Sequence, residues 1–333
     1  MITDTRDRII KYVQYHGQAR AHDLQRELQI SNVAVHKQLK KLLSDGIIAR
    51  KGKPPLVFYV LCVETNEAIQ ITETEQLSAH VKQIIEANFL SITPDGNLLY
   101  GIKGFIYWKN LYQNEKPFGI VAREYADLLG EQKKYFSEKS WIEATLKLKN
   151  AFKEAFVDHL LLQEIYSYKL FGRTKLAKLV MYAKQTGQRE LIDKISFMAK
   201  PVIEKIIKTY SIDAVLFIPP TVPRPIQFMD EFASRLSLSL PEIKLVKVVP
   251  GDIPIPQKTL SSVEERVINA RSSIYLKDTK ESPYKNVLLI DDVAGSGASF
   301  NETAKKLKAV KVKNIIAFAL VGNLKGFDVI REI

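Results

Sequence analysis

The stretch 287–303, VLLIDDVAGSGASFNET, decides the fold of the C-terminal part of this 333-residue chain. It opens with four apolar residues that favour β structure, continues with Asp291, Asp292 and a run of small residues, and leads into the helix-like TAKKLKA. The pattern predicts a strand, an acidic turn, a loop and a helix, in that order.

The small residues of this loop are suited to a terminal phosphate. Gly295 and Gly297 let the backbone bend and approach a ligand, while Ser296 and Ser299 offer hydroxyls beside the amides that open the helix. The two aspartates would repel a phosphate, so we expect them to accept hydrogen bonds from sugar hydroxyls or to face a bound cation. A sugar phosphate carries both the phosphate that the loop would bind and the hydroxyls that the aspartates would bind. A purely structural turn remains an alternative, and a dinucleotide site is disfavoured because GSGAS lacks the third glycine.

The stretch resembles the 5-phosphoribosyl-1-diphosphate (PRPP) motif of type I phosphoribosyltransferases, a hydrophobic strand followed by Asp-Asp and a loop rich in Thr, Ser and Gly. The resemblance makes Asp291 and Asp292 the catalytic pair, which contacts the ribose hydroxyls and faces the Mg²⁺ that accompanies PRPP. It assigns PRPP binding to the pair and to the loop residues Val293, Ala294, Gly295, Ser296, Gly297, Ala298 and Ser299. Gly-Ser replaces the commoner Thr-Thr in this loop, which removes one hydroxyl and no amide.

Three further segments resemble the ComF-like branch of that family. They are YKLFGRTKLAKLVMYAKQTG, IDAVLFIPPTVPRPIQFMDEFASRL and QKTLSSVEERVINARSSI. By this resemblance Pro219, Pro220 and Thr221 form the diphosphate loop with Arg224 beside it, and 250–273 forms a lid. The lid offers Gln257, Lys258, Arg266, Asn269 and Arg271. The branch's Arg-Gly-Phe-Asn-Gln is replaced by IQFMDE. The resemblance implies an α/β phosphoribosyltransferase fold with a mostly parallel sheet over 156–333.

Residues 1–62 resemble the winged helix-turn-helix domains of bacterial regulators. Apolar spacing predicts two short helices, and ISNVAVHKQLKKLLSDGII predicts a third, with Ser31 as N-cap and Val35, Leu39 and Leu42 as its buried face. The β-rich IIAR and LVFYVL flank a Lys/Pro turn and would form the wing.

The charge distribution points to a polyanionic partner. The formal net charge is +12, and eleven basic residues stand against five acidic ones up to Cys62. The resemblance places double-stranded DNA against the third helix and the wing. The residues predicted to contact DNA are Asn32, His36, Lys37, Lys40, Lys41, Arg50, Lys51 and Lys53. The alternative is a protein-interaction domain whose lysines are solvated.

Residues 63–155 predict a mainly helical linker or dimerisation region. Its aromatic residues, Tyr100, Phe105, Tyr107 and Trp108, are expected in a core or a dimer interface. We expect helices to continue through WIEATLKLKNAFKEAFVDHLLLQEIY. The domain organisation is therefore 1–62, 63–155 and 156–333.

No apolar run approaches the roughly 18 residues of a membrane span, and the lone Cys62 excludes an internal disulfide, so we expect a cytoplasmic protein without a membrane partner. The layout is similar to that of purine operon repressors, which join a winged helix to a phosphoribosyltransferase fold and use PRPP as effector. It predicts a homodimeric transcription regulator that binds PRPP or a nucleotide with Mg²⁺. The alternatives are an active transferase with an unidentified acceptor and a DNA-handling protein of competence or phage defence.

Overall fold

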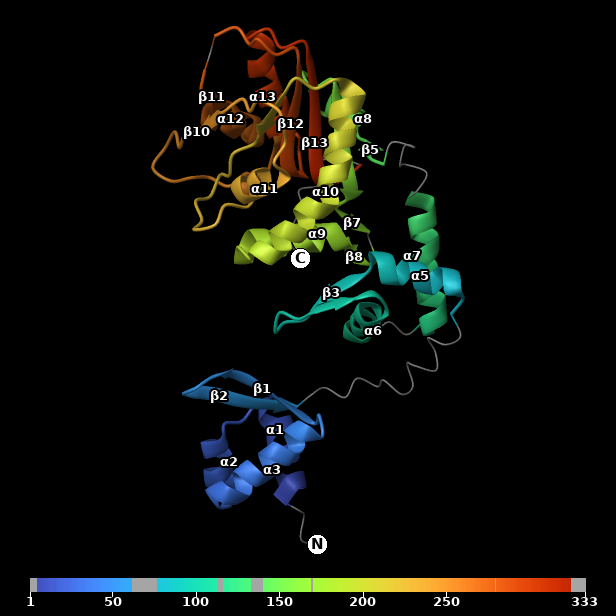
Figure 1. The fold of residues 1–333 in the computed structure, drawn as a ribbon, viewed down its shortest axis with the longest axis vertical. Helices are drawn as coiled ribbons and strands as arrows, with labels where there is room; N and C mark the ends of the chain where they lie inside the picture. Colours follow the sequence, from blue (N-terminus) through green and yellow to red (C-terminus); the bar gives the residue numbers. More distant parts are fainter. Residues whose placement is uncertain are drawn as a thin grey trace. The chain divides into compact units, whose positions relative to one another are not determined.

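The computed structural model divides the chain into two compact units, residues 1–76 and 77–333. Figure 1 shows the elements of each unit. The residues that the structure describes are 5–61, 77–112, 116–132, 140–168, 170–278 and 280–324, without the side chains of Gln14, Lys53 and Lys258.

The first unit consists of three helices and a two-stranded antiparallel hairpin. These elements are α1 (Thr5–His16), α2 (Ala21–Leu28), α3 (Asn32–Ser44), β1 (Ile48–Lys53) and β2 (Leu56–Leu61). The Ser31 hydroxyl accepts a hydrogen bond from the Ala34 amide at 3.3 Å, which confirms the predicted N-cap of α3. Val35, Leu39 and Leu42 are buried, so the predicted buried face of this helix is also confirmed.

The second unit is organised around a five-stranded sheet in the order β5, β6, β13, β12, β9. The strands are β5 (Ile142–Glu143), β6 (His159–Ile165), β13 (Asn314–Gly322), β12 (Asn286–Ala294) and β9 (Ala214–Phe217). Neighbours are parallel from β6 to β9, and only β5 is antiparallel. The expectation of a mostly parallel sheet is therefore confirmed, and four strands end at one carboxyl edge.

The predicted continuous helix through HLLLQEIY is wrong, because this segment forms strand β6. Leu160, Leu161 and Leu162 are all fully buried, since β6 lies inside the sheet between β13 and β5. A short, continuous apolar run fits a helix or a buried strand equally well when only periodicity is considered. Pairing with β13, which is distant in sequence, decides between them.

Helices cover both faces of the sheet (Figure 1). The Leu288 and Ile290 side chains of β12 pack with α9 (Lys175–Thr186), α10 (Arg189–Tyr210) and α11 (Phe228–Leu236). The alternate side chains, Val287 and Leu289, belong to the opposite core. That core includes residues of α8 (Thr145–Ala151), α12 (Val263–Ser273) and α13 (Ala298–Ala309).

The middle region packs within the second unit. Its elements are α5 (Ala79–Asn88), β3 (Leu90–Ile92), β4 (Leu98–Tyr100), α6 (Gly101–Leu111) and α7 (Phe118–Gln132). Phe105 and Trp108 are buried against Phe171, which confirms the core expectation for these two aromatics, whereas Tyr100 and Tyr107 are half-buried. The boundary between a middle region, 63–155, and a phosphoribosyltransferase-like domain, 156–333, stays a prediction.

Short elements complete the second unit. They are β7 (Ser167–Tyr168), β8 (Gly172–Arg173), β10 (Leu245–Lys247), the 3-10 turn Gln257–Thr259 and β11 (Ile274–Leu276). Among the helices in the described ranges, none combines the length and apolarity that crossing a membrane requires.

Candidate functional site

The predicted diphosphate loop and the acidic pair meet at the carboxyl edge of the sheet. The Ile218 amide, just after β9, donates a 2.9 Å hydrogen bond to the Ile290 carbonyl of β12. Pro220 and Thr221 therefore begin their loop beside the residues that follow Ile290. Ligands of open parallel sheets bind outside this edge, so the topology favours a site here.

The loop 295–297 joins β12 to α13, and its second glycine is required by geometry. Gly297 has φ of +80°, and a Cβ atom there would lie 2.2 Å from Leu148 of α8. At Gly295 a Cβ atom would meet nothing within 4 Å, so space does not require glycine there. At the start of α13 the Ala298 amide donates a 3.4 Å hydrogen bond to the Ser296 hydroxyl. The other first amides of a helix have no intrahelical partner, and a helix N-terminus of this kind favours an anion.

A lysine that the sequence did not single out forms an ion pair with one member of the acidic pair. Lys184, in the last turn of α9, forms an ion pair with Oδ2 of Asp292, whose side chain is only 8% exposed. The Asp292 amide donates a 2.8 Å hydrogen bond to Oδ1 of Asp291. Each carboxylate therefore has one oxygen bonded within the protein.

The electrostatics of the pair follow from burial and close charges. Burial and the Asp292 charge raise the pKa of Asp291 far above its usual range, although Lys184 and Lys247 partly oppose this. Burial would lower the pKa of Lys184, but the two aspartates outweigh it, so that pKa is raised. Burial lowers the pKa of Lys247 on β10, against the attraction of Asp291. The group combines two carboxylates with two lysines from separate elements.

The side chains do not fit an Mg²⁺ ion held directly by both aspartates, because Lys184 already occupies Oδ2 of Asp292. Within the described ranges no group of three or more His, Cys, Asp or Glu side chains could hold a metal ion. Mg²⁺ binds through one or two carboxylates together with substrate phosphates. The metal role of Asp291 and Asp292 remains a prediction.

The predicted lid residues bond mainly to one another. Arg266 is buried, and its guanidinium donates to the Leu260 carbonyl at 2.9 and 3.2 Å. The Gln257 amide donates to the Asn269 side chain at 3.2 Å. These bonds hold the segment before α12 in a defined conformation, and the roles of Arg266 and of Lys258, whose side chain is outside the description, remain predictions for PRPP binding.

Helix α12, which belongs to the predicted lid, is also bonded to α13. Arg271 donates two hydrogen bonds to the buried carboxylate of Glu302, at 3.0 and 3.3 Å. Lys306 donates a 2.8 Å bond to the Arg271 carbonyl. Charge-assisted, bidentate contacts of this kind fix orientation, so α12 is positioned by the helix that begins at the loop.

The middle region contributes a second lysine that sequence reasoning missed. Lys147 of α8 is buried, and its ammonium donates to the Asn323 carbonyl at 2.9 Å and, more weakly, to the Ala294 carbonyl at 3.4 Å. It therefore ties the end of β13 to the first peptide of the loop. No motif around KLKNAF indicates this role, since only the fold brings α8 under the loop.

Most of the residues predicted to contact DNA have exposed side chains in the first unit. On α3 the side chains of Asn32, His36, Lys37, Lys40 and Lys41 are exposed. On β1 the Arg50 side chain is exposed and that of Lys51 is half-buried, whereas the Lys53 side chain lies outside the description. The exposed side chains of this set are accessible to a partner molecule.

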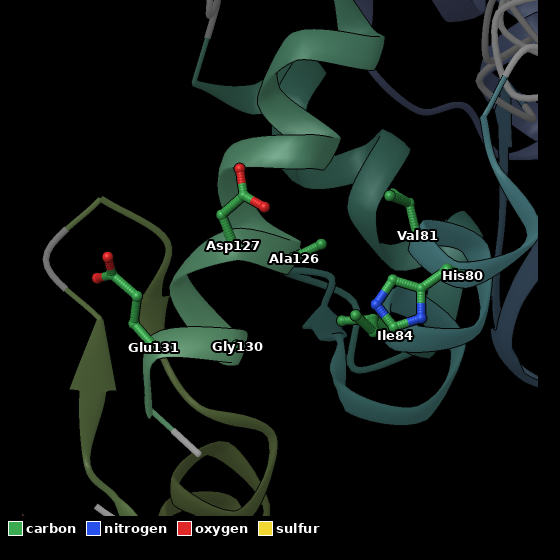
Figure 2. A pocket seen from close by; sticks show the side chains of 7 residues that line it. All are labelled: His80, Val81, Ile84, Ala126, Asp127, Gly130 and Glu131. Atoms are coloured by element: carbon green, nitrogen blue, oxygen red, sulfur yellow. The ribbon is translucent and has the colours of Figure 1, made fainter. Parts of the chain in front are cut away.

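A separate pocket of about 360 Å³ lies between α5 and α7 (Figure 2). Its polar lining consists of His80 on α5 and Asp127 and Glu131 on α7, and none of the predicted site residues lines it. We assign no role to this pocket.

Residues 188–332 match the family model of the phosphoribosyl transferase domain. The C-terminal part of the chain is a phosphoribosyltransferase-type domain. The matched residues contain the acidic pair, the loop and α13, whereas Lys147 and Lys184 precede them. The family model therefore does not include α8 and α9, the helices that carry these two lysines.

No curated protein matches the chain. Among solved structures, a crystal structure of a hypoxanthine phosphoribosyltransferase from Staphylococcus aureus is similar at 16% identity. The similarity covers 42% of this chain and 69% of that chain, with a TM-score of 0.25.

Proposed function

We propose that this protein is a DNA-binding regulator whose phosphoribosyltransferase-type domain binds PRPP or a ribonucleoside 5′-monophosphate as effector. The observation that carries the proposal is the acidic pair, half-buried Asp291 and buried Asp292, in the strand that leads to the N-terminus of α13. Carboxylate oxygens accept hydrogen bonds from ribose hydroxyls, and the helix amides donate to a phosphate. Ribose 5-phosphate carries both groups.

The DNA half of the proposal rests on the first unit. Three helices followed by an antiparallel hairpin have the element order of a winged helix-turn-helix, with α3 as recognition helix and β1–β2 as wing. Exposed lysines on α3 and Arg50 on β1 supply the positive charge that phosphate contacts require. The homodimer, the ComF-like branch, the cytoplasmic location and Mg²⁺ entering with PRPP belong to the same proposal.

The second candidate is an active phosphoribosyltransferase. The fastening of lid helix α12 to α13 by Arg271 and Glu302 favours it, because a positioned lid excludes water from a reacting site. In that case diphosphate leaves the ribose carbon while electrostatic stabilisation supports the charge that develops. Diphosphate release from PRPP in the presence of purine and pyrimidine bases, measured on the full chain, separates the two candidates.

The regulator makes a reciprocal prediction. A ligand shifts DNA affinity only through its different affinities for two states of the protein, and typical couplings of about 1 to 3 kcal/mol correspond to roughly 5- to 150-fold. Calorimetry with PRPP, with and without saturating DNA, should give the same factor as DNA titrations with and without PRPP. Equal PRPP affinity in both conditions would reject the regulator and leave the transferase.

A further inference from the structure

The acidic pair carries its own counter-cation. The Lys184 ammonium lies on Oδ2 of Asp292, and it is supplied by α9, which belongs to neither the loop nor the lid. Asp292 is almost fully buried, whereas Lys184 is half-buried and reaches the pair from the surface. A buried carboxylate needs such a partner, because an unpaired buried charge is costly.

While this ion pair persists, the acidic pair keeps two further carboxylate oxygens that can accept hydrogen bonds. Lys184 bonds to Oδ2 of Asp292, and the Asp292 amide bonds to Oδ1 of Asp291. A carboxylate accepts at both oxygens, so Oδ1 of Asp292 and Oδ2 of Asp291 can each take a hydroxyl. Two vicinal hydroxyls of a ribose match two adjacent acceptors.

A second lysine also acts on the carboxylates. Lys247 of β10 also attracts Asp291, and Arg224 of the loop after β9 lies near enough to Lys184 to repel it. Two lysines from separate elements therefore act on the acidic pair. A divalent cation on Oδ2 of Asp292 would have to displace Lys184.

We propose that Lys184 is the resident counter-cation of the acidic pair, so that ribose 5-phosphate binds with Lys184 in place and without a divalent ion on Asp291 or Asp292. This inference rests on the proposed function of the loop as a ribose-phosphate site. It gives a ligand-binding role to Lys184, a residue of α9 that lies outside the residues matched by the family model.

The first test needs no variant. Ribose 5-phosphate is titrated calorimetrically into the full chain, once with EDTA and once with excess Mg²⁺. We expect affinities that agree within about twofold. A gain of about tenfold or more with Mg²⁺ overturns the inference and leaves the proposed ribose-phosphate site intact. Absence of binding in both buffers overturns the inference together with the proposed site.

Variants then test whether weaker binding is specific to Lys184 or follows from the loss of any positive charge. Lys184→Met should weaken binding in EDTA by about tenfold or more, with part of the loss restored by Mg²⁺, whereas Lys184→Arg should stay close to the unmodified chain. The matched control is Lys208→Met, an exposed lysine on α10. If Lys184→Met binds as the control does in EDTA, Lys184 is not the counter-cation. The same conclusion follows if Mg²⁺ restores nothing.

Discussion

In the first unit the basic side chains of α3 and β1 lie mostly at the surface, whereas in the second unit the charged groups around Asp292 are buried or half-buried and bonded to one another. Exposed charges act over distance, are screened by salt and contribute roughly one phosphate contact each. Buried charges depend on geometry, and removal of one partner leaves the others without compensation. Single substitutions should therefore have large effects in the second unit and small effects in the first.

The largest effect is expected at Asp292. Asp292→Asn removes a charged acceptor and the partner of Lys184, and a hydrogen bond to a charged group contributes about 1.5 to 3 kcal/mol. Affinity for ribose 5-phosphate, measured by calorimetry, should fall roughly ten- to a hundredfold. Asp127→Asn, at an exposed position on α7, is the control and should change nothing. Equal affinity in both variants would contradict the placement of the ribose.

Lys147 tests whether the middle region belongs to the site. Lys147→Met removes the bonds to the Ala294 and Asn323 carbonyls, and an unsatisfied buried acceptor costs about 1 to 3 kcal/mol. We expect ribose 5-phosphate to bind about tenfold more weakly. Lys149→Met alters an exposed residue of the same helix and should bind normally. Because loss of folding would also weaken binding, circular dichroism must show the same melting transition for any variant that is compared.

A pH experiment tests a second carboxyl of the second unit, the half-buried Glu164. Burial raises the pKa of Glu164, at the end of β6, to about 7, and the hydrogen bond from the Leu176 amide opposes this only in part. Between its ordinary pKa and about 7 the folded state binds more protons than the unfolded state. The free energy of unfolding should therefore fall as pH rises through this window.

Glu164→Gln removes this titration. From pH 5 to pH 7.5, urea unfolding should show the unmodified chain losing about 2 kcal/mol relative to the variant. Glu190→Gln, at an exposed position on α10, should leave the pH dependence unchanged. Parallel pH curves for the chain and the Glu164→Gln variant would show that Glu164 is ionised in the folded state throughout.

The smallest effect is expected in the first unit. Lys40→Gln should lower DNA affinity only a few fold and reduce the slope of log affinity against log salt by about one, since one phosphate contact is lost. Lys37→Gln should instead change sequence preference. Lys11→Gln on α1 also removes an exposed charge and is the control. DNA binding that is independent of salt, or a Lys11→Gln variant that behaves as Lys40→Gln does, would refute the assignment of α3.

Local chemistry made some elements predictable. Ser31 caps α3 because its hydroxyl reaches the Ala34 amide within one turn, and VLLIDD becomes β12 because four apolar residues precede a polar edge. The residues at 94–96 also favour a turn by their own chemistry, and the structure has a turn there. The Gly96 amide donates a 2.9 Å hydrogen bond to the Thr93 carbonyl, and Gly96 has φ of +85°. Each of these interactions lies within a few residues.

The sequence by itself determined the acidic pair, the glycine-containing loop and the helix after it, because these lie within one short stretch whose chemistry is local. Only the tertiary structure decided that HLLLQEI is a strand, that Lys147 reaches the start of the loop and that Lys184 reaches the acidic pair. The physical reason is that a buried charge or a parallel strand acquires its partner from a distant segment. That partner is specified by how α8, α9 and β13 pack, and no short-range pattern records it.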